Sequence, residues 1–102
     1  MNLKIVRLLG LIENDAASDD EKAIFRLLNP LAKLYNAKVA IPAISDSIEC
    51  IGGQAIMEDT HIPYLYRDAQ IFSIWEGTTS VLSMDVLRSI IKSNNDAIIA
   101  YR

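Results

Sequence analysis

The fold is decided by one long stretch, residues 18–53, which reads SDDEKAIFRLLNPLAKLYNAKVAIPAISDSIECIGG. Ser18 followed by Glu21 has the spacing of a capping box, and Asp19 and Asp20 suit the positive end of a helix. Apolar residues then recur at spacings of three and four, which is typical of a helix with one buried face. They are Ile24, Leu27, Leu28, Leu31, Leu34, Tyr35, Ile41, Ile44, Ile48 and Ile51.

Two prolines and a glycine pair bear on how far this helix runs. Pro30 and Pro42 lie inside the apolar run. Because proline removes a backbone hydrogen bond and clashes with the preceding turn, we expect them to kink or divide the helix. Gly52 and Gly53 supply a stop signal, since a glycine after the last turn can adopt the left-handed conformation. The sequence therefore predicts a helix over about 19–52.

Shorter segments of helical period lie on both sides of it. Residues 2–14 are apolar around much of the helix circumference, so we expect that helix to be covered on most sides. A third helix is expected over 79–99, with Thr78 or Thr79 capping its exposed amides. Between them, residues 53–78 are expected to form an irregular loop with one turn of helix around Leu65–Ala69.

These elements predict an all-α fold, an up-and-down helical bundle of three main helices in a single domain. The chain has 102 residues, of which 51% are hydrophobic, enough for one modest core. Three long helices with so much apolar surface indicate that the bundle lacks at least one member.

Composition excludes several classes of function. The net charge is −3 with acidic and basic residues interleaved, so direct nucleic-acid binding by this segment is not expected. No apolar run approaches the roughly 20 residues of a membrane span. Cys50 is the only cysteine, which favours a reducing compartment, and we expect it to be buried as a small hydrophobic residue. His61 is the only histidine and has no neighbours at ligand spacing, so no metal site is expected.

The loop at 53–78 holds the residues that suit chemistry. Glu76 lies between Trp75 and Gly77, just before a helix. A carboxylate beside apolar rings has its pKa raised by desolvation, which is how a general base is tuned, although an acidic residue near a helix start is also common. Gly52 and Gly53 either cap the helix or let a phosphate or another chain approach the backbone. The charged residues Glu58-Asp59 and Arg67-Asp68 are expected to pair with each other and hold the loop in shape.

Three motifs recur here in the order and spacing of a known family. They are IGG at 51–53, MED followed by LYRDA within 57–69, and IWEGT at 74–78. With them the chain resembles the C-terminal helical domain of the acyl-CoA dehydrogenases. Residues 74–89, IWEGTTSVLSMDVLRS, are most similar to the branch that contains AidB-like flavoproteins and their animal acyl-CoA-binding relatives.

The resemblance implies a chemistry for the loop. In this family a carboxylate removes the α-proton of an acyl-CoA thioester while a hydride passes from the β-carbon to N5 of FAD. Glu76 matches the position of that catalytic base, with its backbone N–H polarising the thioester carbonyl, and Gly77 matches a substrate contact. The implied FAD-binding positions are Gly52, Gly53, Thr78 and Ser80, the first two meeting the FAD of a neighbouring subunit.

The chain departs from the family pattern at three positions near the implied FAD contacts. Glu49 replaces a usual glutamine, Ala55 a common glycine, and Ser80 a frequent glutamine. A carboxylate only accepts hydrogen bonds and is unfavourable beside a pyrophosphate. The departures therefore weaken the cofactor assignment more than the assignment of Glu76 as the base.

Family members run to several hundred residues, so the resemblance also implies that this chain is a fragment, inactive and without FAD in isolation. Its parent is expected to act on acyl-CoA in fatty acid metabolism as a homo-oligomer, a tetramer by analogy. That parent would pass electrons to an unidentified acceptor in the cytoplasm, or in the mitochondrial matrix of a eukaryote.

Three interpretations stay open. The parent is a working FAD-dependent acyl-CoA dehydrogenase, or an AidB-like relative that binds acyl-CoA or DNA with little turnover. In the third, the chain is a free-standing helical module that self-associates through its apolar faces.

Overall fold

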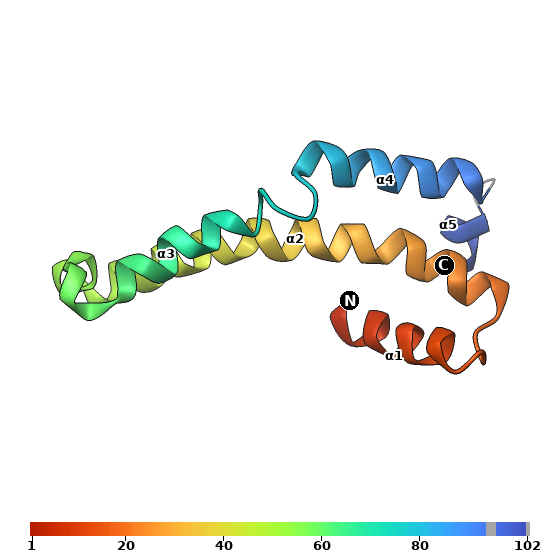
Figure 1. Ribbon diagram of the computed structural model, residues 1–102, viewed down its shortest axis with the longest axis horizontal. Helices are drawn as coiled ribbons and strands as arrows, with labels where there is room; N and C mark the ends of the chain where they lie inside the picture. Colours follow the sequence, from red (N-terminus) through yellow and green to blue (C-terminus); the bar gives the residue numbers. More distant parts are fainter. Residues whose placement is uncertain (94–95, 102) are drawn as a thin grey trace. The chain divides into compact units, whose positions relative to one another are not determined.

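The computed structural model describes residues 1–93 and 96–101, and within them every element is helical. The all-α fold class is therefore confirmed (Figure 1). The helices are α1 (Asn2–Glu13), α2 (Asp19–Ile51), α3 (Ile62–Ile71), α4 (Thr79–Lys92) and α5 (Asp96–Tyr101), with two 3₁₀ helices, η1 (Gly53–Ile56) and η2 (Glu58–Thr60). None of the described helices is both long and apolar enough to cross a membrane.

The chain divides into two compact units, Met1–Lys33 with Ser80–Arg102, and Leu34–Thr79. In the first unit α1 folds back on the beginning of α2. Their contact is a small core in which Leu8 is 1% exposed, with Ile24 and Leu28 beside it. Removing a leucine side chain of this size from water contributes roughly 1.5–3 kcal/mol, so Leu8 is the main anchor of α1.

The capping box predicted at the start of α2 is confirmed. The backbone N–H of Ser18 donates to Oε2 of Glu21 at 3.0 Å, and the backbone N–H of Glu21 donates to Oγ of Ser18 at 3.2 Å. These two bonds satisfy backbone donors that a helix start otherwise leaves to water. Oε1 of Glu21 also lies 3.9 Å from a guanidinium nitrogen of Arg7, which ties the cap to α1.

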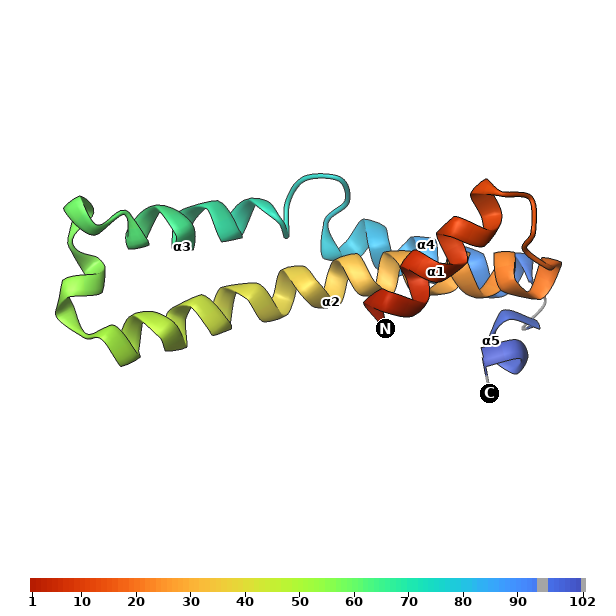
Figure 2. The ribbon, with the colours of Figure 1, turned by 90° about the horizontal axis from the view of Figure 1, so that it is seen from below.

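In the second unit α3 runs back alongside the later turns of α2 (Figure 2). The chain reverses through Gly52, η1 and η2, and the residues buried in this unit are the small Ala37, Ala55 and Ala69. Small side chains let backbones approach closely, which fits a narrow antiparallel pair better than a broad core.

The structure confirms the long helix predicted over about 19–52 and decides between the two effects expected of its prolines. Pro30 and Pro42 do not divide α2, which is continuous from Asp19 to Ile51. The carbonyls that lose a donor belong to Arg26 and Lys38, both exposed residues, so water can replace the missing bonds.

The loop between α2 and α4 is also more ordered than expected. In place of one turn around Leu65–Ala69 there is a ten-residue helix, α3. Pro63 lies in its first turn, where a missing N–H costs nothing, and a proline at such a position favours a helix start. The third helix predicted over 79–99 is α4 to Lys92 and α5 from Asp96, with residues 94–95 outside the described residues.

Cys50 is exposed, so the expectation that it is buried is wrong. It lies two residues after Ile48 on α2, and two residues turn a helix by about 200°. That places the Cys50 thiol away from the apolar side that Ile48 belongs to.

Candidate active site

The candidate site is built on the connection between α3 and α4. After α3, the backbone N–H of Ser73 donates to the carbonyl of Gln70 at 3.3 Å. The N–H groups of Ile74 and Trp75 donate to the carbonyl of Ile71 at 2.9 and 3.0 Å. Because these bonds hold the backbone up to Trp75, the position of the next residue, Glu76, is set by α3.

Glu76 has an unusual backbone conformation. Its φ is +53°, in the left-handed region, and Gly77 follows with a φ of +113°. A side chain in that region costs of order 1–3 kcal/mol, and such residues cluster at functional sites. Two successive positive φ angles turn the chain sharply between the end of α3 and the start of α4 at Thr79.

The carboxylate of Glu76 is exposed and makes no hydrogen bond or ion pair with any residue in the described ranges. Trp75 beside it is 55% exposed. The described part of this chain therefore supplies neither the apolar enclosure expected around the carboxylate nor a partner that would neutralise its charge. The group is free to accept a proton from a ligand placed against it.

The glycine pair has two different conformational requirements. Gly52 has a φ of +83°, which a side chain rarely adopts, whereas Gly53 has no positive φ and begins η1. A Cβ added at either residue would meet nothing within 4 Å. Gly52 is thus needed for the turn, while neither conformation nor crowding in the described residues explains a glycine at 53.

The predicted site residues form two groups within the chain. Glu76, Gly77 and Thr78 are consecutive, and Ser80 lies in the first turn of α4. Gly52 and Gly53 lie at the other end of α3, which has ten residues and is about 15 Å long (Figure 2). The structure does not bring the glycine pair to Glu76, so one chain offers two separate surfaces to its ligands.

An ion pair braces the turn between the glycine pair and α3, as expected for this loop. The guanidinium of Arg67 donates to both oxygens of Glu58, each at 2.9 Å, and lies 4.6 Å from the ring centroid of Tyr64. The hydrogen bonds from Arg67 lower the pKa of Glu58 below its ordinary 4.5. Two parallel charge-assisted bonds also fix the orientation of both groups, so η2 is held against α3.

Residues 1–91 match the profile of the acyl-CoA dehydrogenase C-terminal domain. The chain belongs to the acyl-CoA dehydrogenase family. It is 58% identical over 82 residues to acyl-CoA dehydrogenase family member 11 of Caenorhabditis elegans, covering 80% of this chain and 13% of that protein. It is 35% identical over 79 residues to the putative acyl-CoA dehydrogenase AidB of Escherichia coli, covering 76% of this chain and 15% of that protein.

The crystal structure of a related protein indicates the same family. The crystal structure of Caenorhabditis elegans ACDH-11 in complex with C11-CoA matches with a TM-score of 0.90 and 51% identity. The match covers 96% of this chain and 16% of that one. The chain therefore spans between 13% and 16% of the length of these three relatives. Its similarity to the AidB-like branch of the acyl-CoA dehydrogenase family is confirmed.

Two features of the structure were not foreseen from the sequence. One is the left-handed conformation of Glu76, which glycine, asparagine or aspartate would have signalled but glutamate does not. The other is a basic groove in the first unit, described below. In the sequence this groove is indicated by two pairs of like charges with a spacing of four residues, Lys22 with Arg26 and Arg88 with Lys92.

Proposed function

We propose that this chain is the C-terminal helical part of an FAD-dependent acyl-CoA dehydrogenase in which Glu76 is the catalytic base. The observation that carries the proposal is the local geometry of Glu76. It is an unpartnered, exposed carboxylate on a left-handed residue, followed by a glycine and a helix start, in the motif IWEGT. A free carboxylate held at a fixed backbone position is what proton abstraction beside a carbonyl requires.

The step assigned to this chain is the removal of one proton. The carboxylate of Glu76 accepts the α-proton of the acyl thioester, and its own backbone N–H donates to the thioester oxygen as negative charge develops there. A backbone donor of this kind acts as an oxyanion contact that no side-chain substitution removes. Gly77, with its positive φ and no side chain, leaves room for the acyl chain to approach.

The residues present fit a flavin contact through backbone and hydroxyl groups. The position next to Gly53 is open, and Thr78 and Ser80 are exposed. Gly52 and Gly53 would contact FAD through their backbone groups. Because Glu76 lies at the other end of α3, that FAD would be the one bound by a neighbouring subunit of a homo-oligomer. When bound, FAD supplies the acceptor for the hydride that leaves the β-carbon. Glu49, exposed in the last turn of α2, lies outside this set.

Exchange of the α-proton tests the role of Glu76 directly. We expect the complete polypeptide to exchange the α-proton of an acyl-CoA with deuterium from heavy water, followed by mass spectrometry. Glu76→Gln should slow this exchange by about 10²–10⁴-fold, the usual contribution of a positioned base. Glu13→Gln, an exposed carboxylate in α1, is the matched control. Equal exchange in wild type and Glu76→Gln would contradict the proposal.

A second candidate is a relative that binds acyl-CoA with little turnover. The carboxylate at Glu49 favours it, because a group that only accepts hydrogen bonds is unfavourable beside the pyrophosphate of FAD. Calorimetry with an acyl-CoA, together with the flavin spectrum, separates the two candidates. Heat of binding with no change in the flavin supports the second candidate, and binding with reduction supports the first.

A further inference from the structure

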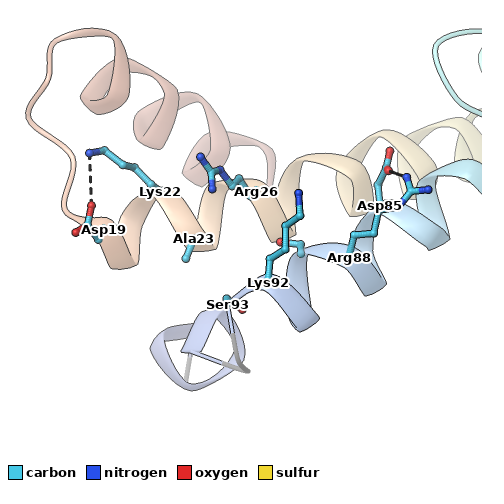
Figure 3. Close-up of a pocket in the computed structure, with 9 residues that line it drawn as sticks. Asp19, Lys22, Ala23, Arg26, Asp85, Arg88, Lys92 and Ser93 are labelled. Carbon is cyan, nitrogen blue, oxygen red and sulfur yellow. Dashed lines mark hydrogen bonds and ion pairs between the residues drawn. The ribbon is translucent and has the colours of Figure 1, made fainter.

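A groove of about 500 Å³ lies between the first turns of α2 and the second half of α4, within the first compact unit (Figure 3). Four cationic side chains line it, Lys22 and Arg26 from α2 and Arg88 and Lys92 from α4. Two carboxylates line it as well, so the side chains of the groove carry a net charge of about +2 at neutral pH. The groove shares no residue with the loop that carries Glu76.

The spacing of the cations makes this arrangement self-repelling. On each helix the two cations are four residues apart and therefore share one face, Lys22 with Arg26 and Arg88 with Lys92. Like charges at that spacing destabilise a helix, and here the two faces line one hollow. An anion in the groove would relieve the repulsion on both helices at once.

The carboxylates of the groove do not neutralise all four cations. Each is paired within its own helix, Asp19 with Lys22 at 3.6 Å and Asp85 with Arg88 at 2.8 Å. Arg26 and Lys92 have no ion pair with any residue of 1–93 or 97–101. Figure 3 shows their charged ends extending to the same side of α2 and α4.

Hydroxyl groups complete the set of donors. Ser89 and Ser93 line the same groove from α4, and Ser93 donates to the carbonyl of Ile90 at 3.1 Å. The hydroxyl of Ser89 has no hydrogen bond to any residue of the described ranges. A guanidinium, an ammonium and a free hydroxyl on two helices suit an anion with several oxygens and more than one charge.

We propose that this groove binds the phosphoryl or pyrophosphoryl group of a small soluble ligand. Arg26 donates through its fork to two oxygens, and Lys92 supplies the second charge from the opposite helix. Ser89 donates one further hydrogen bond. A single carboxylate carries only one charge and would leave one of the two unpaired cations uncompensated. Four cations in one hollow are too few to follow a nucleic-acid backbone.

The test is a titration of the 102-residue chain with inorganic pyrophosphate at constant ionic strength, followed by amide NMR. We expect saturable shifts confined to residues around Arg26 and 88–93. Arg26→Gln and Lys92→Gln should each weaken the affinity about tenfold or more, because each removes a charge-assisted bond. Lys38→Gln, which removes an exposed, unpaired lysine elsewhere on α2, should change it less than twofold.

Circular dichroism checks that the variants fold, and folding should survive because Arg26 and Lys92 are both exposed. A non-saturable response, or equal weakening by Lys38→Gln, would overturn the proposal in favour of diffuse screening. A second arm uses vesicles containing phosphatidic acid. Capture of the chain by these vesicles without saturable pyrophosphate binding would overturn it too. The phosphate that the groove binds would then belong to a lipid headgroup and not to a soluble ligand.

Discussion

At the scale of single residues, Glu76 combines a strained backbone with a side chain that nothing in the described residues holds. Its φ of +53° would suit glycine better, so local stability does not account for a glutamate at this position. A cost of this kind persists where the side chain is needed for another purpose. The residue pattern around Glu76 predicted a functional carboxylate, but its conformation depends on the turn after α3.

This strain gives the first prediction. Glu76→Gly should stabilise the chain by about 1 kcal/mol, because glycine adopts a positive φ without a steric penalty. The matched change Glu49→Gly, in the last turn of α2, should destabilise it by about 0.5–1 kcal/mol. Urea unfolding followed by circular dichroism measures both. A loss of stability in Glu76→Gly would mean that the conformation is not strained.

The glycine pair gives a second prediction, with one residue as the control for the other. Gly52→Ala forces a side chain into a φ of +83° and should cost about 1 kcal/mol or more. Gly53→Ala meets no atom within 4 Å and should change stability by less than about 0.5 kcal/mol. In the complete polypeptide, we expect Gly53→Ala to lower the flavin content. Unchanged flavin content would remove Gly53 from the cofactor site.

At the scale of elements, the sequence predicted where α2 begins and ends better than it predicted the effect of the prolines inside it. The capping box at Ser18 and the glycine stop after Ile51 are both as predicted, because each is a local pattern of donors and backbone angles. Whether Pro30 divides the helix could not be predicted, since the solvation of a freed carbonyl depends on which side of α2 faces water. The tertiary environment decides that, and periodicity alone does not.

The Glu58–Arg67 pair gives a prediction about pH at the same scale. Because the pKa of Glu58 is lowered in the folded chain, the contribution of the pair is fully present above its ordinary value of 4.5. That contribution is lost as the pH falls through the lowered pKa. Carbon NMR titration should show a Glu58 midpoint below 4.5 that returns toward 4.5 in Arg67→Gln. Equal midpoints in the two proteins would show that the pair does not persist in solution.

At the scale of the whole molecule, the chain exposes apolar surface that its own helices do not cover. Leu3 is 87% and Val6 66% exposed on α1, so the described part of the chain does not cover this helix on most sides, contrary to the expectation from its apolar circumference. The relatives matched here are several times longer, so their further segments are available to cover such surfaces. The sequence predicted an incomplete bundle for this reason, but not which faces of α1 stay open.

The exposed residues of α1 predict self-association of the isolated chain. Light scattering at increasing concentration should give a mass above that of the 11.4 kDa monomer. The double substitution Leu3→Lys and Val6→Lys should shift the chain toward the monomer, since it places charge on the exposed face without touching buried Leu8. A stable wild-type monomer at all concentrations would argue against the prediction.

The central claim, that Glu76 is the base of a flavin-dependent acyl-CoA dehydrogenase, is tested most directly by the flavin itself. Acyl-CoAs of different chain length are added anaerobically to the complete polypeptide while the visible absorption of the flavin is recorded. We predict that the absorption bleaches in wild type and in Glu13→Gln and stays unchanged in Glu76→Gln. A flavin that remains oxidised in wild type with every acyl-CoA, or that bleaches equally in Glu76→Gln, would contradict the account.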